Sequence, residues 1–226
     1  MRTLFLAIAL IGVEFLTGSA FAVPVAIQRR DIKFPTQQMV EKQSFTNPIA
    51  SNDSTLKSAF AGPTSAAAVT LSSFLASVDV ARDITVTPGG TTGDIETCQV
   101  TINGTNYFGS TMTEGLNFAA NATGKLTTAG AFKTVTSVVW AANCESGAFA
   151  ATWSIGQGEK LGLSHCVANA GDFFFSLFNG AKEATAPTLT VNASAVSLNT
   201  SDFNGAMQGS NDFVLFYMQN YGCFAP

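Results

Sequence analysis

The chain has few of the residue types that most often carry chemistry. Its 226 residues include one histidine, two tryptophans and four cysteines, and only 12% of them are charged. A single histidine cannot form a three-histidine metal site, and the sequence has no C-x-x-C pair for a structural zinc site. It also has no P-loop, H-E-x-x-H, G-x-S-x-G or calcium-loop motif. We therefore expect no metal and no cofactor.

Positive charge is scarce as well. Eleven Lys and Arg stand against 15 Asp and Glu, which gives a formal net charge of -4, and there is no basic run. Nucleic acid and anionic membranes are therefore not expected as partners. After the N-terminal leader no apolar run is long enough to cross a bilayer, so we expect no membrane span.

Residues 1–22 have the layout of a secretory signal peptide. Arg2 precedes an apolar run over residues 4–13, and Ala20 and Ala22 are the small residues at the -3 and -1 positions of a cleavage site. We expect cleavage after Ala22, and therefore a secreted, extracellular protein.

A dibasic pair follows at Arg29 and Arg30. It indicates that residues 23–30 form a propeptide removed after Arg30, although an ordinary charged pair in a leader is the alternative. The leader resembles those of fungal secreted preproproteins. This resemblance covers about thirty residues and implies nothing about the domain behind them.

The four cysteines all lie beyond this leader, at Cys98, Cys144, Cys166 and Cys223. An even number of cysteines in an oxidising compartment predicts two disulfides. Three pairings exist. We favour Cys98–Cys144 with Cys166–Cys223, because shorter loops close at a lower entropic cost.

The hydrophobic pattern divides the rest of the chain. Residues 31–62 are polar and show no sustained period, which predicts a poorly ordered lead-in. Within residues 65–82 the apolar positions step by three and four, which predicts a short N-terminal helix, although part of this stretch also fits a strand. Residues 63–226 are interpreted as a single β-rich, disulfide-bonded domain.

From residue 84 onward the period is mostly two, which is typical of strands. Asn103-Gly104 predicts a tight hairpin turn, because both central residues of such a turn need positive φ. About eight to ten short strands with turn signals between them predict a mainly β fold, an antiparallel sandwich or barrel with a core rich in Phe. The predicted strands cover residues 84–87, 97–102, 134–141, 148–155, 161–167, 173–178, 188–194 and 214–218. A loop over Gly156-Gln157-Gly158-Glu159 is predicted to join the strands 148–155 and 161–167.

Two kinds of site remain open to prediction. Five Asn-x-Ser/Thr sequons predict a glycoprotein, at Asn52, Asn103, Asn121, Asn192 and Asn199. Paired carboxylates are the remaining route to catalysis, with Glu96 and Glu159 as the candidates. His165 is interpreted as a core or rim residue, since Ser164 beside it would point to the other face of a strand and could not form a Ser–His device.

These observations favour a secreted non-enzymatic glycoprotein of the cell-wall, surface, matrix or effector type. Its expected partner is an extracellular carbohydrate or protein surface. Two alternatives stay open: a glycan-acting hydrolase that uses two carboxylates, and a carrier that holds an apolar ligand in a Phe-lined cavity. Convergent acids in an open groove would favour the hydrolase, and an enclosed apolar cavity of about 300 Å³ or more would favour the carrier.

Overall fold

The structure of the protein is a computed structural model, and it describes residues 39–62, 69–74, 76–146 and 150–220. These residues form fourteen strands and three short 3-10 helices, and every strand pairing is antiparallel. The mainly β prediction is therefore confirmed. None of the described helices is long and apolar enough to cross a membrane. The predicted signal peptide and propeptide lie outside the described residues.

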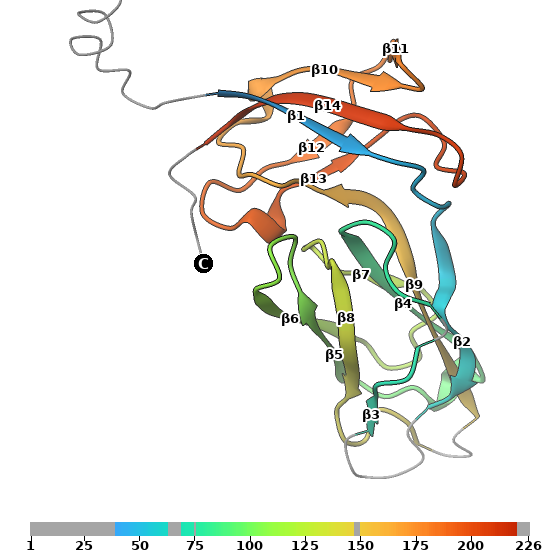
Figure 1. Ribbon diagram of the computed structural model, residues 1–226. Helices are drawn as coiled ribbons and strands as arrows, with labels where there is room; N and C mark the ends of the chain where they lie inside the picture. Colours follow the sequence, from blue (N-terminus) through green and yellow to red (C-terminus); the bar gives the residue numbers. More distant parts are fainter. Residues whose placement is uncertain (1–38, 63–68, 75, 147–149, 221–226) are drawn as a thin grey trace, which may run out of the picture. The chain divides into compact units, whose positions relative to one another are not determined.

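The strands form three sheets (Figure 1). The first has the order β1 (Met39–Phe45), β14 (Phe213–Gln219), β10 (Phe173–Phe178) and β11 (Ala181–Lys182). The second has the order β12 (Thr188–Thr190), β13 (Thr200–Asp202), β9 (Ala151–Gly162), β4 (Arg82–Gly90) and β7 (Leu126–Thr127), with β2 (Asn52–Ala61) also paired to β9. The third has the order β3 (Val69–Leu71), β8 (Thr134–Trp140), β5 (Cys98–Thr105) and β6 (Thr111–Phe118). The 3-10 helices are η1 (Thr92–Asp94), η2 (Ala170–Asp172) and η3 (Val196–Leu198).

Strand β9 contributes to two hydrophobic cores. Its first half places Trp153 in a cluster with Trp140 from β8, and both indole rings are fully buried. Its last part places Leu161 in a second cluster with Phe213 and Tyr217 from β14. Burial of each large side chain stabilises the fold by about 1.5–3 kcal/mol, so both clusters hold β9 firmly in place.

One edge of β9 is shared by two strands, and this creates a gap. β2 pairs with β9 as far as Asn52 opposite Gln157, and the pairing of β9 with β13 starts only at Lys160, opposite Asp202. Gly158 and Glu159 fall between these two partners. On the other edge the ladder with β4 is also irregular, because Asp83 alone faces the three residues 158–160. Bulges of this kind redirect side chains and are common next to functional sites.

The predicted disulfide Cys98–Cys144 is confirmed. It ties the start of β5 to the segment after β8, across a sequence separation of 46 residues. Cys166 is disulfide-bonded as well. Its predicted partner, Cys223, lies outside the described residues.

Two predictions for the N-terminal part of the domain need correction. Residues 39–45 and 52–61, assigned to a poorly ordered lead-in, form β1 and β2. Apart from the buried Gln43, their polar residues are exposed or half-buried while Phe45 and Leu56 are buried, so only a few apolar positions indicated these strands. The short helix over 65–82 is not confirmed. Residues 69–71 form the strand β3. The residues 72–74 and 76–81 that follow have no helical structure. The rest of the predicted helix, residues 65–68 and 75, lies outside the described residues.

Two predicted turns are also absent. Asn103-Gly104 lies inside β5, and the connection to β6 falls at residues 106–110. A Cβ atom on Gly104 would lie 1.9 Å from the Thr134 carbonyl oxygen, so this glycine serves close packing against β8 and not a turn. Residues 156–159, predicted to join two strands, belong to the continuous strand β9. Gly156 fits there because the backbone of Asn52 approaches it closely.

Candidate functional site

A pocket of about 230 Å³ opens at the gap along β9. We call it the charged pocket, because three carboxylates, two ammonium groups and three hydroxyls line it. Its residues are Ser51, Asp83, Thr85, Lys125, Thr127, Gly158, Glu159, Lys160 and Asp202.

Strand register explains why these polar side chains meet. Asp83 and Thr85 are two residues apart on β4, so they lie on the same face of the sheet. Thr127 on β7 is directly opposite Thr85, and Asp202 on β13 is directly opposite Lys160 on β9. Since cross-strand partners place their side chains on one face, four strands contribute a continuous polar floor.

Asp83 is the most deeply placed acid in the pocket. It is 2% exposed, and its Oδ1 accepts a hydrogen bond from the Lys160 N–H at 3.0 Å. Burial raises the pKa of Asp83 to about 6, against the smaller opposing effects of this hydrogen bond and of the charges on Arg82 and Lys160. A carboxyl group with this pKa can hold a proton at mildly acidic pH.

Asp202 lies close enough to Glu159 to be affected by its charge. Burial raises the pKa of Asp202, the negative charge of Glu159 raises it further, and Lys160 lowers it. The predicted candidate Glu159 is therefore brought together with two acids, Asp83 and Asp202, for which the sequence analysis assigned no role.

The Thr85 hydroxyl is an unusual feature of the pocket. Thr85 is 1% exposed, and its Oγ1 has no hydrogen-bond partner within the described part of the chain. A buried polar group without a partner costs about 1–3 kcal/mol. Such groups often mark a place where a ligand or a bound water supplies the missing hydrogen bond.

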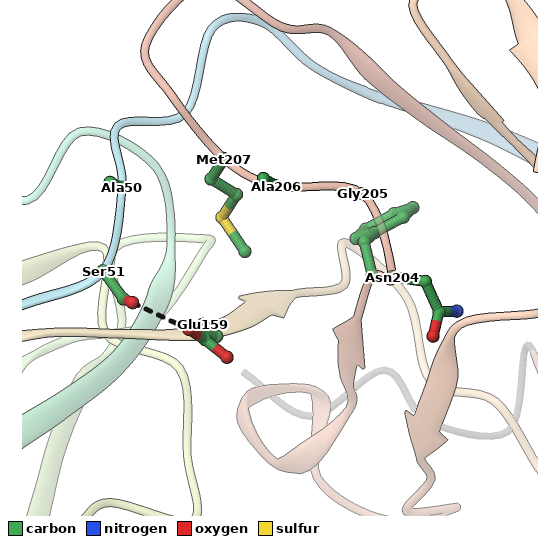
Figure 2. A pocket seen from close by; sticks show the side chains of 8 residues that line it. Ala50, Ser51, Glu159, Asn204, Gly205, Ala206 and Met207 are labelled. Atoms are coloured by element: carbon green, nitrogen blue, oxygen red, sulfur yellow. Dashed lines mark hydrogen bonds between the residues drawn. The ribbon is translucent and has the colours of Figure 1, made fainter.

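A second pocket adjoins the first. Ser51 Oγ donates a hydrogen bond to Glu159 Oε1 at 2.9 Å, and both residues line both pockets. Figure 2 shows this bond and, across the space from it, the segment that carries Met207 and Asn204. We call this pocket of about 270 Å³ the central pocket; its lining is completed by Ala50, Phe203, Gly205 and Ala206.

The other catalytic candidate, Glu96, lies elsewhere. It accepts a hydrogen bond from Ser146 Oγ at 2.6 Å, and its backbone N–H donates to the carbonyl oxygen of Cys144, beside the disulfide. Glu96 lines neither the charged pocket nor the central pocket. The structure therefore does not pair it with Glu159.

Ser164 and His165 differ from the sequence interpretation. They lie after β9, outside any strand, and Ser164 Oγ is 3.0 Å from His165 Nδ1. Ser164 is nevertheless buried, and its hydroxyl also contacts Gln43 Oε1 and the Tyr217 hydroxyl. A serine enclosed in this way belongs to an internal hydrogen-bond network and is not open to a substrate.

The sequons differ in how they are placed. Asn52 and Asn121 are exposed. The side-chain amide of Asn103 bonds Ser137 and Thr113, and Asn192 Oδ1 accepts hydrogen bonds from the backbone N–H groups of Ser194 and Ala195. Asn199 is fully buried, and its amide donates to two backbone carbonyls, so the folded domain has no room for a glycan there.

A sequence signal for the missed acid Asp83 does exist. Arg82 and Asp83 are adjacent charges at the start of a strand whose other residues are all uncharged, and charged side chains are rarely fully buried without a partner. Asp202 carries no comparable signal, because it lies in a polar segment and reaches the pocket only through the register of β13.

Two further results bear on function. Among the described residues no three His, Cys, Asp or Glu side chains are grouped so that they could hold a metal ion. Comparisons with protein-family models, with curated proteins and with solved structures find no match for this chain. The functional argument therefore rests on the geometry of the charged pocket.

Proposed function

We propose that this chain is a secreted binding protein that recognises glycans of a wall, matrix or host surface through the charged pocket. Sugars present adjacent hydroxyl groups that both donate and accept hydrogen bonds. The carboxylates of Glu159 and Asp202 are acceptors, and the ammonium group of Lys160 is a donor. A mixed set of this kind suits a neutral polyhydroxylated ligand better than an ion of either sign.

The observation that carries the proposal is the unpartnered Thr85 hydroxyl in the floor of the pocket. The Thr85 hydroxyl is enclosed in the free protein, and a rotation of this side chain towards the pocket would let a sugar hydroxyl beside Asp83 supply the hydrogen bond that Thr85 lacks. Binding would then remove a cost that the free protein carries, which favours a ligand with hydroxyl groups over an apolar one.

The carrier hypothesis finds less support. It requires an enclosed apolar cavity, whereas the charged pocket is lined mainly by charged and hydroxyl-bearing side chains. Among the described residues, Trp140, Trp153 and Phe213 are fully buried in packed clusters. These aromatic side chains therefore form the core and do not line a ligand chamber.

The test is an array of immobilised neutral, amino and acidic glycans, probed with the wild-type protein and two variants. Thr127→Trp places a large side chain at an exposed position of the charged pocket. Ala120→Trp is the matched control, at an exposed position that lines neither the charged nor the central pocket. The proposal expects binding that Thr127→Trp abolishes and Ala120→Trp preserves. Equal signals from both variants, or no binding to any glycan, would refute it.

A glycan hydrolase is the second candidate, favoured by the raised pKa of Asp83 beside two further acids. Asp83 would donate its proton to the glycosidic oxygen, while Glu159 or Asp202 would accept a proton from the attacking water. The measurement is the release of reducing ends from a bound glycan near pH 5. Release by the wild-type protein that is absent in Asp83→Asn would support this activity. Binding without release of reducing ends would leave the binding function alone.

A further inference from the structure

We propose that the charged pocket is one end of a groove with three subsites, which takes a linear glycan of about three sugar units. This inference rests on the proposed function and extends it from a single site to a chain-length specificity.

The groove consists of pockets that share lining residues. The charged and central pockets share Ser51 and Glu159. The central pocket in turn shares Asn204 and Gly205 with a third pocket of about 310 Å³, the terminal pocket, which Phe178, Lys182 and Glu183 also line. The three volumes, about 230, 270 and 310 Å³, are similar, as expected for subsites that each take one repeating unit.

The lining changes along the groove in a way that suits a sugar chain. The central pocket is lined in part by Phe203 and Met207, core side chains that leave only a small apolar surface open for the C–H face of a sugar ring. The terminal pocket combines the ring of Phe178 with the charged groups of Lys182 and Glu183. The central and terminal pockets therefore each offer an apolar surface with polar groups beside it. The charged pocket offers hydrogen-bonding groups alone.

The junction between the central and terminal pockets is held in place. Asn204 Nδ2 donates to the carbonyl oxygen of Ala186 at 2.8 Å, and the Gly205 N–H donates to Glu183 Oε1 at 3.0 Å. A Cβ atom on Gly205 would lie 2.6 Å from the ring of Phe178, so the junction admits no side chain at this position. The segment that both pockets share as lining is therefore held in place before a ligand binds.

The wall of the central pocket is fixed from below by Arg82. This fully buried side chain contacts the Met207 sulfur through Nη2 at 3.0 Å and donates from Nη1 to the carbonyl oxygen of Ile49 at 3.1 Å. These contacts join the segment before β2 to the segment after β13, which form opposite sides of the pocket. A preformed groove loses less entropy when it binds an extended ligand.

The experiment measures the affinity of β-1,3-glucan and chitin oligosaccharides of one to six units by calorimetry. The groove predicts that affinity rises at least about tenfold from one to three units and then stays constant. Ala184→Trp, at an exposed position of the terminal pocket, should reduce the affinity for the trimer to that for the dimer. Ala50→Trp, in the central pocket, should reduce the affinity for the trimer to the affinity for the monomer. The control Ala120→Trp should leave all of these affinities unchanged.

Failure of this inference and failure of the proposed function give different results. If Thr127→Trp abolishes binding but the monomer and trimer bind equally well, the charged pocket is a single site and the three-subsite groove is wrong. If no oligosaccharide binds the wild-type protein at all, the glycan-binding function fails with it. Melting temperatures of the variants verify that each is folded.

Discussion

Gly158 on β9 lies directly against Asp83 on β4. A Cβ atom on Gly158 would come within 2.3 Å of both carboxylate oxygens of Asp83, closer than any real contact allows. Only glycine at this position lets the buried acid keep its place in the floor of the charged pocket.

The first prediction follows from this contact. Gly158→Ala should displace the Asp83 carboxylate, reduce the free energy of unfolding by about 1–3 kcal/mol and weaken glycan binding. Gly171→Ala is a suitable control, because nothing lies within 4 Å of a Cβ atom there. Denaturant unfolding of both variants measures the difference. Equal stability of the two variants would show that Asp83 is not held as described.

The second prediction concerns pH. The pKa of Asp83 is about 6 in the folded protein and 3.8 without burial, so the folded state holds its proton more tightly. Stability from this group is fully present below about pH 4 and falls as the pH rises towards 6, by about 3 kcal/mol in all. Asp83→Asn does not titrate, so its stability relative to wild type should increase by that amount between pH 4 and pH 7. Parallel pH profiles would contradict the burial of this charge.

The third prediction concerns Asn199, which connects two segments. Its amide donates to the carbonyl oxygens of Asn192 and Ala195, and its Oδ1 accepts from the N–H groups of Val167 and Asn192. Asn199→Ala leaves these buried groups without partners, so the free energy of unfolding should fall by about 3 kcal/mol or more. The exposed Asn117→Ala, on β6, should change it by less than about 0.5 kcal/mol. Chemical denaturation of the two variants measures both free energies of unfolding, and equal values would contradict the role of Asn199.

The fourth prediction concerns the disulfide Cys98–Cys144. Closing a loop of 46 residues restricts the unfolded chain and should stabilise the fold by about 4 kcal/mol. Replacing both cysteines by alanine should lower the unfolding free energy by a comparable amount. A double variant as stable as wild type would mean that the bond contributes nothing to the folded domain.

The fifth prediction concerns the leader. Intact-mass analysis of the protein secreted by its source should give an N-terminus at Val23 or, if the dibasic pair is cut, at Asp31. The mass should show two disulfides and glycans at Asn52 or Asn121, but none at Asn199. A chain that begins at Met1 and has four free thiols would contradict the predicted secretion, on which the proposed function depends.

The sequence was sufficient for the strands whose pattern is local. The apolar residues over 134–141 and 173–178 predicted β8 and β10. The disulfide Cys98–Cys144 also followed from loop length. The two strands depend on neighbours in the chain, which a sequence pattern records directly, whereas the disulfide followed from the small number of possible pairings.

The errors have a common physical cause. Gly104 and Gly156 were interpreted as turn residues, but each is a glycine because another backbone or carbonyl group approaches it from a distant strand. Such close contacts are long-range, and the local pattern of a turn glycine is the same. The charged pocket was missed for the same reason, since Asp83, Glu159 and Asp202 meet only through the pairing of β4, β9 and β13.

The most direct test of the central claim is a calorimetric titration of the wild-type protein with a glycan trimer, repeated with Thr127→Trp and Ala120→Trp. We predict that wild type and Ala120→Trp bind with the same affinity and that Thr127→Trp shows no heat of binding. A trimer that binds all three proteins equally would place recognition outside the charged pocket and contradict the account.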